Sequence, residues 1–390
     1  MPAPLDGRRV WLVGIGGAGL SAYGLLARAW GAEVGGWDRN ETPYLEAVRG
    51  RGIEVRISPE PEPPEGWEVF VSSAYPDVPG RPRAELLAEL VSLRPSIVVA
   101  GAHGKTTTAA MIAFALRKTG GDPSWIVGGE VPQLGANAGA GEGWLVVEGD
   151  ESDRSVEALR PQIALVTNVD LDHHSAFGSR AEVEALFERW LAHVPQVVRG
   201  WELDPADVAL AVPGEHNRRN AAAALAVLEL AGVSRAEAAA ALARFAGVAR
   251  RFELIGEAGG VAVYDDYAHN PVKVAAALET ARAKSEGRVL VLFQPHLFSR
   301  TRELARAFGE ALAAADRSLV LPIYPARERR EDFPGVDAGL IAADEHPGSF
   351  EEAYARLEVE LRAGDLCLVM GAGDVDTLGR MLVRGGEIRR

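Results

Sequence analysis

The stretch Pro95 to Ala110, PSIVVAGAHGKTTTAA, constrains the fold more strongly than any other part of this sequence. Its apolar residues 97–100 predict a buried strand, and the residues from Lys105 onward predict a helix. In such a strand–loop–helix, backbone N–H groups and the helix dipole bind phosphate oxygens, the lysine reaches the outer phosphates, and the next hydroxyl, here Thr106, reaches Mg²⁺. The stretch therefore predicts a phosphate-binding loop, shortened because Val99 stands where the usual motif has its first glycine. The alternative is a helix cap beside a surface lysine.

Length and composition indicate a protein of several domains. A chain of 390 residues exceeds one ordinary core and predicts two or three domains. The net charge of -14 argues against nucleic-acid binding, which depends on a basic surface. Cys367 is the only cysteine, so no intramolecular disulfide can form. Residues 1–10 lack a signal-peptide core and no apolar run reaches roughly 18 residues. We therefore predict a cytoplasmic protein without membrane insertion, as a monomer or homodimer.

The N-terminal segment carries a second glycine loop. A predicted strand at 9–13 runs into GIGGAG (14–19), a helix is predicted from 20 to 30, and a second strand ends at Asp38. A GxGxxG turn with an acid about twenty residues further on is the fingerprint of a dinucleotide-binding fold. The segment therefore predicts a nucleotide diphosphate at the helix N-terminus, but the motif alone does not specify NAD.

Two polar clusters follow predicted strands downstream of the phosphate loop. The strand 144–147 precedes EGDESD (148–153), and the strand 163–168 precedes VDLDHH (169–174). Because hard cations prefer carboxylate oxygens, the first cluster predicts a Mg²⁺ site, with a solvated acidic turn as the alternative. The carboxylate and two histidines at the end of the second cluster would complete a metal or phosphate site.

The following segment predicts a helix at 180–193, a short strand at 208–212 and a helix at 221–231. Asn217 and Asn220 stand at the start of this last helix. Their amides can cap the helix or hydrogen-bond a nucleobase edge, and the sequence leaves both options open.

Beyond residue 248 the chain again alternates predicted strands and helices. The clusters DDYAHNP, PHLFSRT and GAGD each follow a predicted strand. Because ligands of open parallel sheets bind outside the carboxyl ends of the strands, these clusters predict a further binding edge.

In chain order these motifs resemble the Mur ligases of peptidoglycan synthesis. The matching stretches are GIGGAGLSA, VSSAYPD, GAHGKTTT, EGDESD, TNVDLDHH, PGEHNRRNAAAA, ARRFE, YDDYAHNP, FQPHLFSRT and GAGD. The resemblance implies an α/β protein of three domains. These are a Rossmann-like UDP-sugar-binding domain (1–94), a shortened P-loop ATPase-like central domain (95–248) and a Rossmann-like amino-acid-binding domain (249–390).

The resemblance also implies a reaction, the ATP-dependent addition of L-alanine to UDP-N-acetylmuramate through an acyl phosphate, with ATP and Mg²⁺ as cofactors. The catalytic residues that it implies are Lys105, Glu148, His173, His269 and Arg300.

The binding residues are implied by position in the same motifs. For ATP they are Gly101, His103, Gly104, Lys105, Thr106, Thr107, Asn217, Asn220, Arg251 and Asp266. For the UDP sugar they are Gly16, Gly17, Ala18, Gly19, Asp38, Ser73, Asn137 and Ser152. For the amino acid they are Tyr267, His269 and Arg300, and for the metal Thr106, Glu148 and His173.

Three features depart from the family pattern. Asn270 replaces a histidine of the DYxHHP motif, and Leu297 stands where many members carry arginine. Between His193 and Pro213 only a short connection remains where the family normally has additional sheet. The alternatives are a recycling ligase that attaches a whole murein peptide to the same sugar, and a nucleotide-binding scaffold without catalysis. An NAD-dependent oxidoreductase would follow only if the GxGxxG turn bound NAD.

Overall fold

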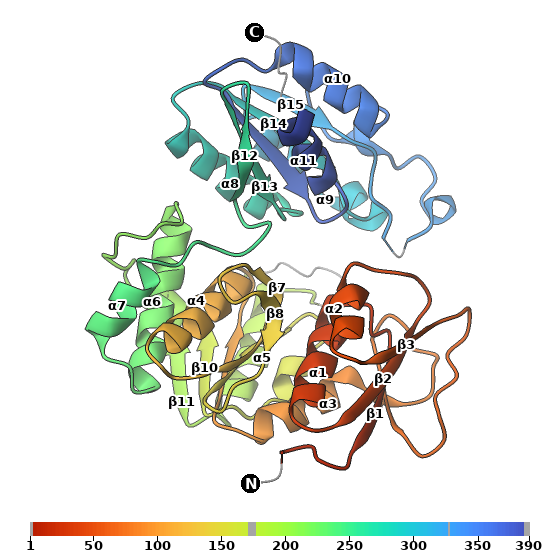
Figure 1. Cartoon of the computed structure of the whole chain (residues 1–390). Coiled ribbons are helices and arrows are strands. Elements are labelled where there is room, and N and C mark those ends of the chain that lie inside the picture. The colour runs from red at the N-terminus through yellow and green to blue at the C-terminus, as the bar shows by residue number, and fades with distance from the viewer. Residues whose placement is uncertain (1–2, 171–176, 327, 386–390) are drawn as a thin grey trace. The chain divides into compact units, whose positions relative to one another are not determined.

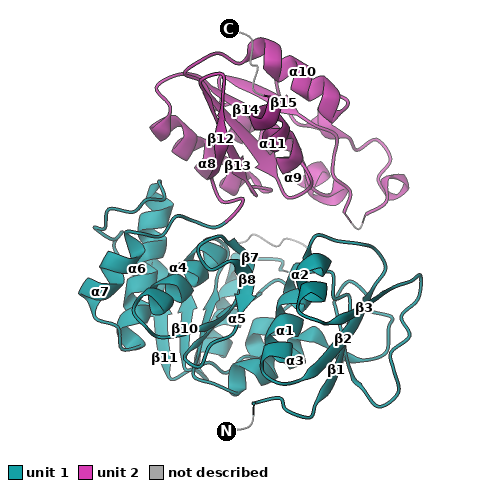
Figure 2. Ribbon diagram, in the orientation of Figure 1, with its two compact units in different colours: residues 1–248 teal, residues 249–390 magenta. Residues whose placement is uncertain are grey.

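A computed structural model describes residues 3–170, 177–326 and 328–385. The chain divides into two compact units, residues 1–248 and 249–390 (Figure 2). The described residues form three sheets, two of them in the first unit (Figure 1). Helices alternate with mostly parallel strands, so the predicted α/β class is confirmed.

The first sheet has the order β3-β2-β1-β4-β5, and all its strands are parallel. Its strands are β1 (Arg9–Val13), β2 (Glu33–Asp38), β3 (Glu54–Ile57), β4 (Glu68–Val71) and β5 (Arg81–Pro82). The helices α1 (Ala18–Ala29), α2 (Tyr44–Gly50) and α3 (Arg83–Ser92) all pack on one face.

The opposite face of this sheet is covered by aromatic side chains rather than by a helix. Trp11 and Trp37 are fully buried there, with Trp67 and Tyr75 packed against them. The acidic, proline-rich loop after β3 contributes Ser58, whose Oγ accepts the indole N–H of Trp37 at 2.8 Å. This loop therefore has a structural contact as well as solvent exposure.

The second sheet has the order β11-β10-β6-β9-β7-β8, parallel except for the pair β7 and β8. Its strands are β6 (Ser96–Ala100), β7 (Ser124–Val131), β8 (Ala136–Gly139), β9 (Leu145–Glu148), β10 (Ile163–Val166) and β11 (Gln196–Arg199). Helices α4 (Lys105–Lys118), α6 (Glu215–Leu230) and α7 (Arg235–Leu242) pack on one face. The 3-10 helices are η1 (Ser155–Ala158) and η2 (Gly200–Glu202).

The other face of the second sheet shares one hydrophobic core with the helices of the first sheet. That core joins α1, α2 and α3 to α5 (Arg180–Leu191) and to sheet residues such as Val98 and Val166. A shared core explains why residues 1–248 form one compact unit, since two layers that bury each other's apolar faces do not separate.

Three local predictions in this unit were wrong or incomplete. Residues 208–212 form no strand. The glycine-rich stretch after α4 contains β7 and β8, and the edge strand β11 was not predicted. Strand β11 and η2 lie in the short connection before α6.

The second unit holds a sheet of order β12-β13-β16-β14-β15, parallel except for β12. Its strands are β12 (Glu253–Ala258), β13 (Val261–Asp266), β14 (Val289–Gln294), β15 (Arg317–Val320) and β16 (Leu366–Gly371). Helices α8 (Pro271–Lys284) and α9 (Phe298–Leu312) cover one face, and α10 (Phe350–Glu360) and α11 (Asp376–Gly385) cover the other. The 3-10 helices are η3 (Arg330–Asp332) and η4 (Ala338–Leu340).

No helix within the described ranges is long and apolar enough to cross a membrane. Cys367 is fully buried in β16.

Candidate active site

The phosphate loop joins the buried strand β6 to helix α4, as the sequence predicts. Two of its glycines have left-handed backbone conformations, Gly101 with φ +122° and Gly104 with φ +79°. A Cβ on Gly104 would lie 2.3 Å from Asn220 Oδ1, and a Cβ on Gly101 would lie 2.4 Å from Thr167 Oγ1. Both positions therefore need glycine, for conformation and for space.

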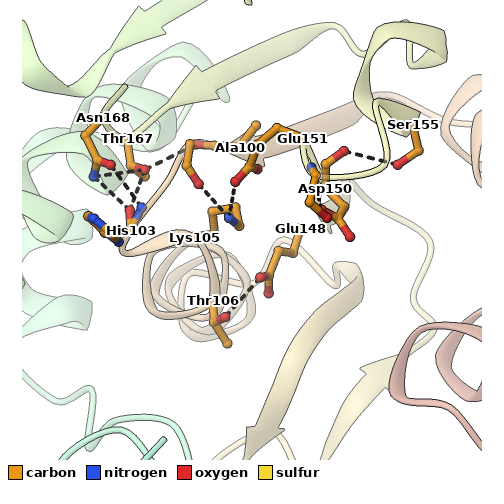
Figure 3. Close-up of polar contacts among 12 residues, drawn as sticks. Ala100, His103, Lys105, Thr106, Glu148, Asp150, Glu151, Ser155, Thr167 and Asn168 are labelled. Carbon is orange, nitrogen blue, oxygen red and sulfur yellow. Dashed lines mark hydrogen bonds and ion pairs between the residues drawn. The ribbon is translucent and has the colours of Figure 1, made fainter. Parts of the chain in front are cut away.

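The end of β10 holds this loop in place (Figure 3). The backbone N–H of His103 donates to Asn168 Oδ1 at 2.9 Å, and the His103 carbonyl accepts from Thr167 Oγ1 at 2.6 Å. Asn168 Nδ2 donates to the same carbonyl at 2.9 Å. The sequence analysis did not select Thr167 or Asn168, although they end the predicted strand 163–168.

Lys105 is held between the loop and the acidic segment that follows β9. Its Nζ donates to the Gly101 carbonyl at 2.6 Å and to Glu151 Oε1 at 2.8 Å (Figure 3). Burial acts to lower the pKa of Lys105, but the carboxylates of Glu151 and Glu148 outweigh it and the pKa is raised. The ammonium group therefore stays charged, as phosphate binding requires.

Thr106 and Glu148 form the pair predicted for the metal. Thr106 Oγ1 donates to Glu148 Oε1 at 3.0 Å, while Glu148 Oε2 accepts the Gly128 N–H at 2.7 Å. A hydroxyl and a carboxylate next to a phosphate loop suit Mg²⁺. This ion usually binds only one or two protein oxygens and fills its other positions with water and phosphate oxygens. His173 lies outside the described residues. Within the described ranges no group of three or more His, Cys, Asp or Glu could hold a metal.

Asn217 and Asn220 lie inside the first turns of α6 and are mostly buried. Asn217 Nδ2 donates to the Pro213 carbonyl at 2.6 Å, and Asn220 Nδ2 donates to Asn217 Oδ1 at 3.2 Å. The helix begins at Glu215, earlier than predicted, so these amides stabilise the helix start, and Asn220 also lies beside Gly104 of the phosphate loop.

The GxGxxG turn has its predicted position between β1 and α1, but its acid has a local partner. Asp38 is buried, and its Oδ2 accepts the Gly16 N–H at 2.8 Å. Asp38 Oδ1 accepts the Tyr75 hydroxyl at 3.0 Å and the Arg39 N–H at 2.8 Å. In this structure Asp38 thus fixes the glycine turn itself.

The other residues expected at the UDP sugar lie on four segments. Gly17 precedes α1 and Ala18 begins it, and the Ala18 carbonyl lies 3.5 Å from Asn137 Nδ2 of β8. Ser152 Oγ donates to Asp150 Oδ1 at 2.6 Å. Ser73 is exposed on the turn after β4. The structure thus brings Asn137 to the start of α1.

In the second unit, the expected amino-acid residues form a cluster of rings. Tyr267 and His269 meet edge to face, with ring centroids 5.3 Å apart. His269 Nδ1 lies 2.9 Å from the Tyr267 carbonyl, so this nitrogen carries the hydrogen and Nε2 has the lone pair. Burial, and then the positive charges of Lys273 and Arg300, hold the pKa of His269 well below its usual value, which keeps the ring neutral.

His296 is a member of this cluster that the sequence analysis did not single out. Its ring stacks on Tyr324, and its Nδ1 lies 3.3 Å from Arg300 Nη1. Because arginine only donates, His296 Nδ1 is the acceptor, and the pair orients the Arg300 guanidinium.

Arg251 and Asp266, expected at the nucleotide, also have local contacts. The Arg251 guanidinium lies over the Tyr267 ring, 5.2 Å from its centroid. Asp266 accepts the backbone N–H groups of Phe252 at 2.8 Å and Ala268 at 2.7 Å. Burial disfavours the charged form of the Asp266 carboxyl and so raises its pKa. The carboxylate therefore fixes the backbone at Phe252 and Ala268 at the electrostatic cost of a buried charge.

Comparisons with known proteins match two parts of the chain to one family. Residues 99–198 match the Mur ligase middle domain, and residues 250–373 match the Mur ligase glutamate ligase domain. A UDP-N-acetylmuramate--L-alanine ligase of Streptomyces coelicolor is 40% identical, with 97% of each chain covered. The chain belongs to the Mur ligase family.

Two solved structures extend this comparison to the fold of the Mur ligase. A UDP-N-acetylmuramate-alanine ligase of Thermotoga maritima superposes with a TM-score of 0.79 at 26% identity, covering 97% of this chain and 98% of the other. A murein peptide ligase of Psychrobacter arcticus gives a TM-score of 0.66 at 22% identity, with 97% and 98% covered. At that identity the second match supports the fold alone.

The Mur ligase is shorter than its Streptomyces relative. Their alignment extends over 454 positions, more than the 390 residues of this chain, so the relative has segments that are missing here. The phosphate loop, the acidic segment and the start of α6 are all retained around the second sheet.

The two substitutions that depart from the family motifs have distinct local roles. Asn270 is the N-cap of α8, and its Oδ1 accepts the Lys273 N–H at 2.8 Å. Leu297 precedes α9 with φ +73° and is buried. Asparagine is a strong N-cap, which explains its fit at 270, whereas leucine in the left-handed region is strained.

Proposed function

We propose that this Mur ligase joins L-alanine to the carboxylate of UDP-N-acetylmuramate with consumption of ATP. The observation that carries the proposal is the phosphate loop with Lys105 charged and Thr106 paired to Glu148. The names of the full-length relatives support the choice of sugar and amino acid. Cytoplasmic location and a monomeric or homodimeric state stay predictions.

The first half-reaction would take place at the phosphate loop. Lys105 would exchange its contact with the Gly101 carbonyl for the β and γ phosphates of ATP. Thr106 and Glu148 would hold one Mg²⁺, and His173 would hold a second near the γ-phosphate; the metal ions would supply charge neutralisation on the phosphate oxygens. The sugar's lactyl carboxylate would attack the γ-phosphorus, giving an acyl phosphate and ADP.

The second half-reaction would use the ring cluster of the second unit. Arg300 would bind the carboxylate of L-alanine, oriented by His296. His269 is neutral with its lone pair on Nε2, so it would accept a hydrogen bond from the alanine ammonium, which would release one proton to solvent before it reacts. The free amine would then attack the acyl carbon, and phosphate would leave.

Phosphate release tests this proposal. We expect release from Mg-ATP and UDP-N-acetylmuramate only when L-alanine is added, and a sugar product carrying one added alanine by mass spectrometry. Lys105→Ala should lose turnover while it still binds the UDP sugar. Normal phosphate release by that variant would overturn the assignment of the site.

Product analysis, ligand binding and melting temperature separate the alternative functions. A product formed only with a murein peptide would indicate the recycling ligase. Binding of ATP and UDP-N-acetylmuramate without any release would indicate a scaffold. Stabilisation of the protein by NAD, measured as a rise in melting temperature, would indicate an oxidoreductase.

A further inference from the structure

Arg83, the first residue of α3, connects the two sheets of the first unit. Its Nη2 lies 2.7 Å from Asp153 Oδ2 and 3.3 Å from Asp150 Oδ2, both on the acidic segment after β9. Its Nη1 lies beside the glycine turn, because a Cβ on Gly19 would come within 2.7 Å of that nitrogen. The guanidinium thus stands between the acidic segment and the start of α1.

The donors of Arg83 are only partly used. Its Nε is buried without a hydrogen-bond partner among the described residues. No hydrogen bond joins Nη1 to any residue in the described ranges, whereas Nη2 holds both carboxylates. A buried donor without a partner costs free energy, so an arginine that served only as an ion-pair link would be poorly arranged.

The start of α1 is suited to an anion at the same place. Its N-cap, Gly17, gives no side-chain cap, and the first turn contains no acidic residue. The first N–H groups of a helix have no intrahelical acceptor. Nearby, burial raises the pKa of Tyr23 to about 12, so its hydroxyl stays protonated. A negatively charged ligand there would satisfy both the helix end and Arg83.

The two aspartates balance the charge of Arg83 through Nη2 alone, and each also accepts hydrogen bonds within its own segment. Asp150 Oδ1 accepts the N–H and hydroxyl of Ser152, and Asp153 Oδ1 accepts the Ser155 N–H. Burial acts to lower the pKa of Arg83, but nearby negative charge, including that of Asp153 and Asp150, outweighs it and the pKa is raised. The arginine is therefore permanently charged, and the aspartates fix the direction in which Nη1 and Nε point.

We propose that Arg83 binds the diphosphate of the UDP substrate at the start of α1. This inference rests on the proposed function for the identity of the ligand. Backbone N–H groups of the first turn of α1 would bind one phosphate, and the unused edge of the Arg83 guanidinium would bind the other.

The test compares UDP with UMP by calorimetry on the full chain. Loss of one charge-assisted hydrogen-bonded contact predicts about 10- to 100-fold weaker UDP binding by Arg83→Gln. UMP binding should change much less, so the preference for UDP over UMP should nearly disappear. In kinetics, the KM for UDP-N-acetylmuramate should rise while the KM for ATP stays within about threefold.

Two further variants distinguish binding from structure. Arg94, just beyond the other end of α3, is also largely buried and pairs with Glu142, so Arg94→Gln is a matched control that should keep UDP affinity. Asp153→Asn removes an ion pair but leaves the guanidinium, so it should weaken UDP binding less than Arg83→Gln.

The other possible results of these binding experiments would overturn either the role of Arg83 or the proposed function. Equal loss of UDP affinity in Asp153→Asn and Arg83→Gln would overturn the proposal in favour of a purely structural ion pair. Unchanged UDP binding by Arg83→Gln would overturn the role of Arg83 alone. Failure of the wild-type chain to bind UDP would overturn the proposed function as well. If Arg83→Gln does not fold, Arg83→Lys with the same ligand pair decides between these outcomes.

Discussion

The contact between Lys105 and Glu151 leads to a quantitative prediction about stability. Nζ and Oε1 are 2.8 Å apart, and the side chains are 15% and 2% exposed. Removing one member of a buried ion pair typically costs about 3–5 kcal/mol, because the other charge stays buried. For Lys105→Met, which leaves the nearly inaccessible Glu151 carboxylate, we expect about 3 kcal/mol. For Glu151→Gln we expect about 2 kcal/mol, because the amide oxygen still accepts a hydrogen bond from Lys105.

The double variant separates the pair from its surroundings. With both charges absent, neither is left buried and unpaired, so the total loss should be about 3 kcal/mol rather than the sum of the single losses. The coupling free energy is then about 2 kcal/mol in favour of the pair.

Urea unfolding monitored by tryptophan fluorescence measures the free energy of unfolding of each variant, for the compact unit that contains this pair. All eight tryptophans lie in residues 1–248, so the signal reports on the unit that contains both side chains. Single losses that add to within about 0.5 kcal/mol in the double variant would refute the reasoning, because they would show no coupling across the 2.8 Å contact.

Three further predictions concern other parts of the structure. Gly104→Ala should destabilise the first unit by about 2 kcal/mol and abolish phosphate release, because its Cβ would collide with Asn220 at a left-handed position; urea unfolding and the phosphate assay check this. Burial raises the pKa of Asp265 to about 7, so the folded state keeps a proton that the unfolded state releases. The second unit should therefore lose stability as pH rises from about 4 to about 7, and Asp265→Asn should remove this slope. This slope is measured as the urea midpoint at each pH, followed by chemical labelling of Cys367, which is buried in the folded unit. The labelling pulse itself is carried out at one fixed pH. Asn270→Ala should cost the second unit about 1 kcal/mol through its N-cap, and Asn270→Asp should cost less by the same probe.

Sequence patterns predicted those parts of the site that lie within one strand, loop and helix. The order of β6, the glycine loop and α4 was predicted because apolar strand residues, glycines and Lys105 are contiguous in the chain. Thr106 and the acids after residue 147 were each expected at Mg²⁺, and the resemblance to the Mur ligases implied that Thr106 and Glu148 share it. Their hydrogen bond forms because β6 and β9 are neighbours in the sheet.

Other contacts depend on where distant segments meet, and no short pattern specifies this. The loop anchors Thr167 and Asn168 were missed because polar residues at a strand end have many possible partners. Residues 208–212, VALAV, form an apolar run like that of a strand, yet they pair with none of the described strands, and the strand beside β10 is β11. Strand propensity therefore had no effect there.

The amino-acid sequence by itself determined the α/β class, the two glycine loops and the charge types at the strand ends. These features follow from local preferences: glycine tolerates left-handed conformations, and apolar runs become buried strands. Only the tertiary structure decided that Asp38 stabilises its own glycine turn, that Glu151 holds Lys105, and that Arg83 stands between two sheets. Each of these contacts joins residues far apart in the chain, so its partner is selected by strand order and helix packing.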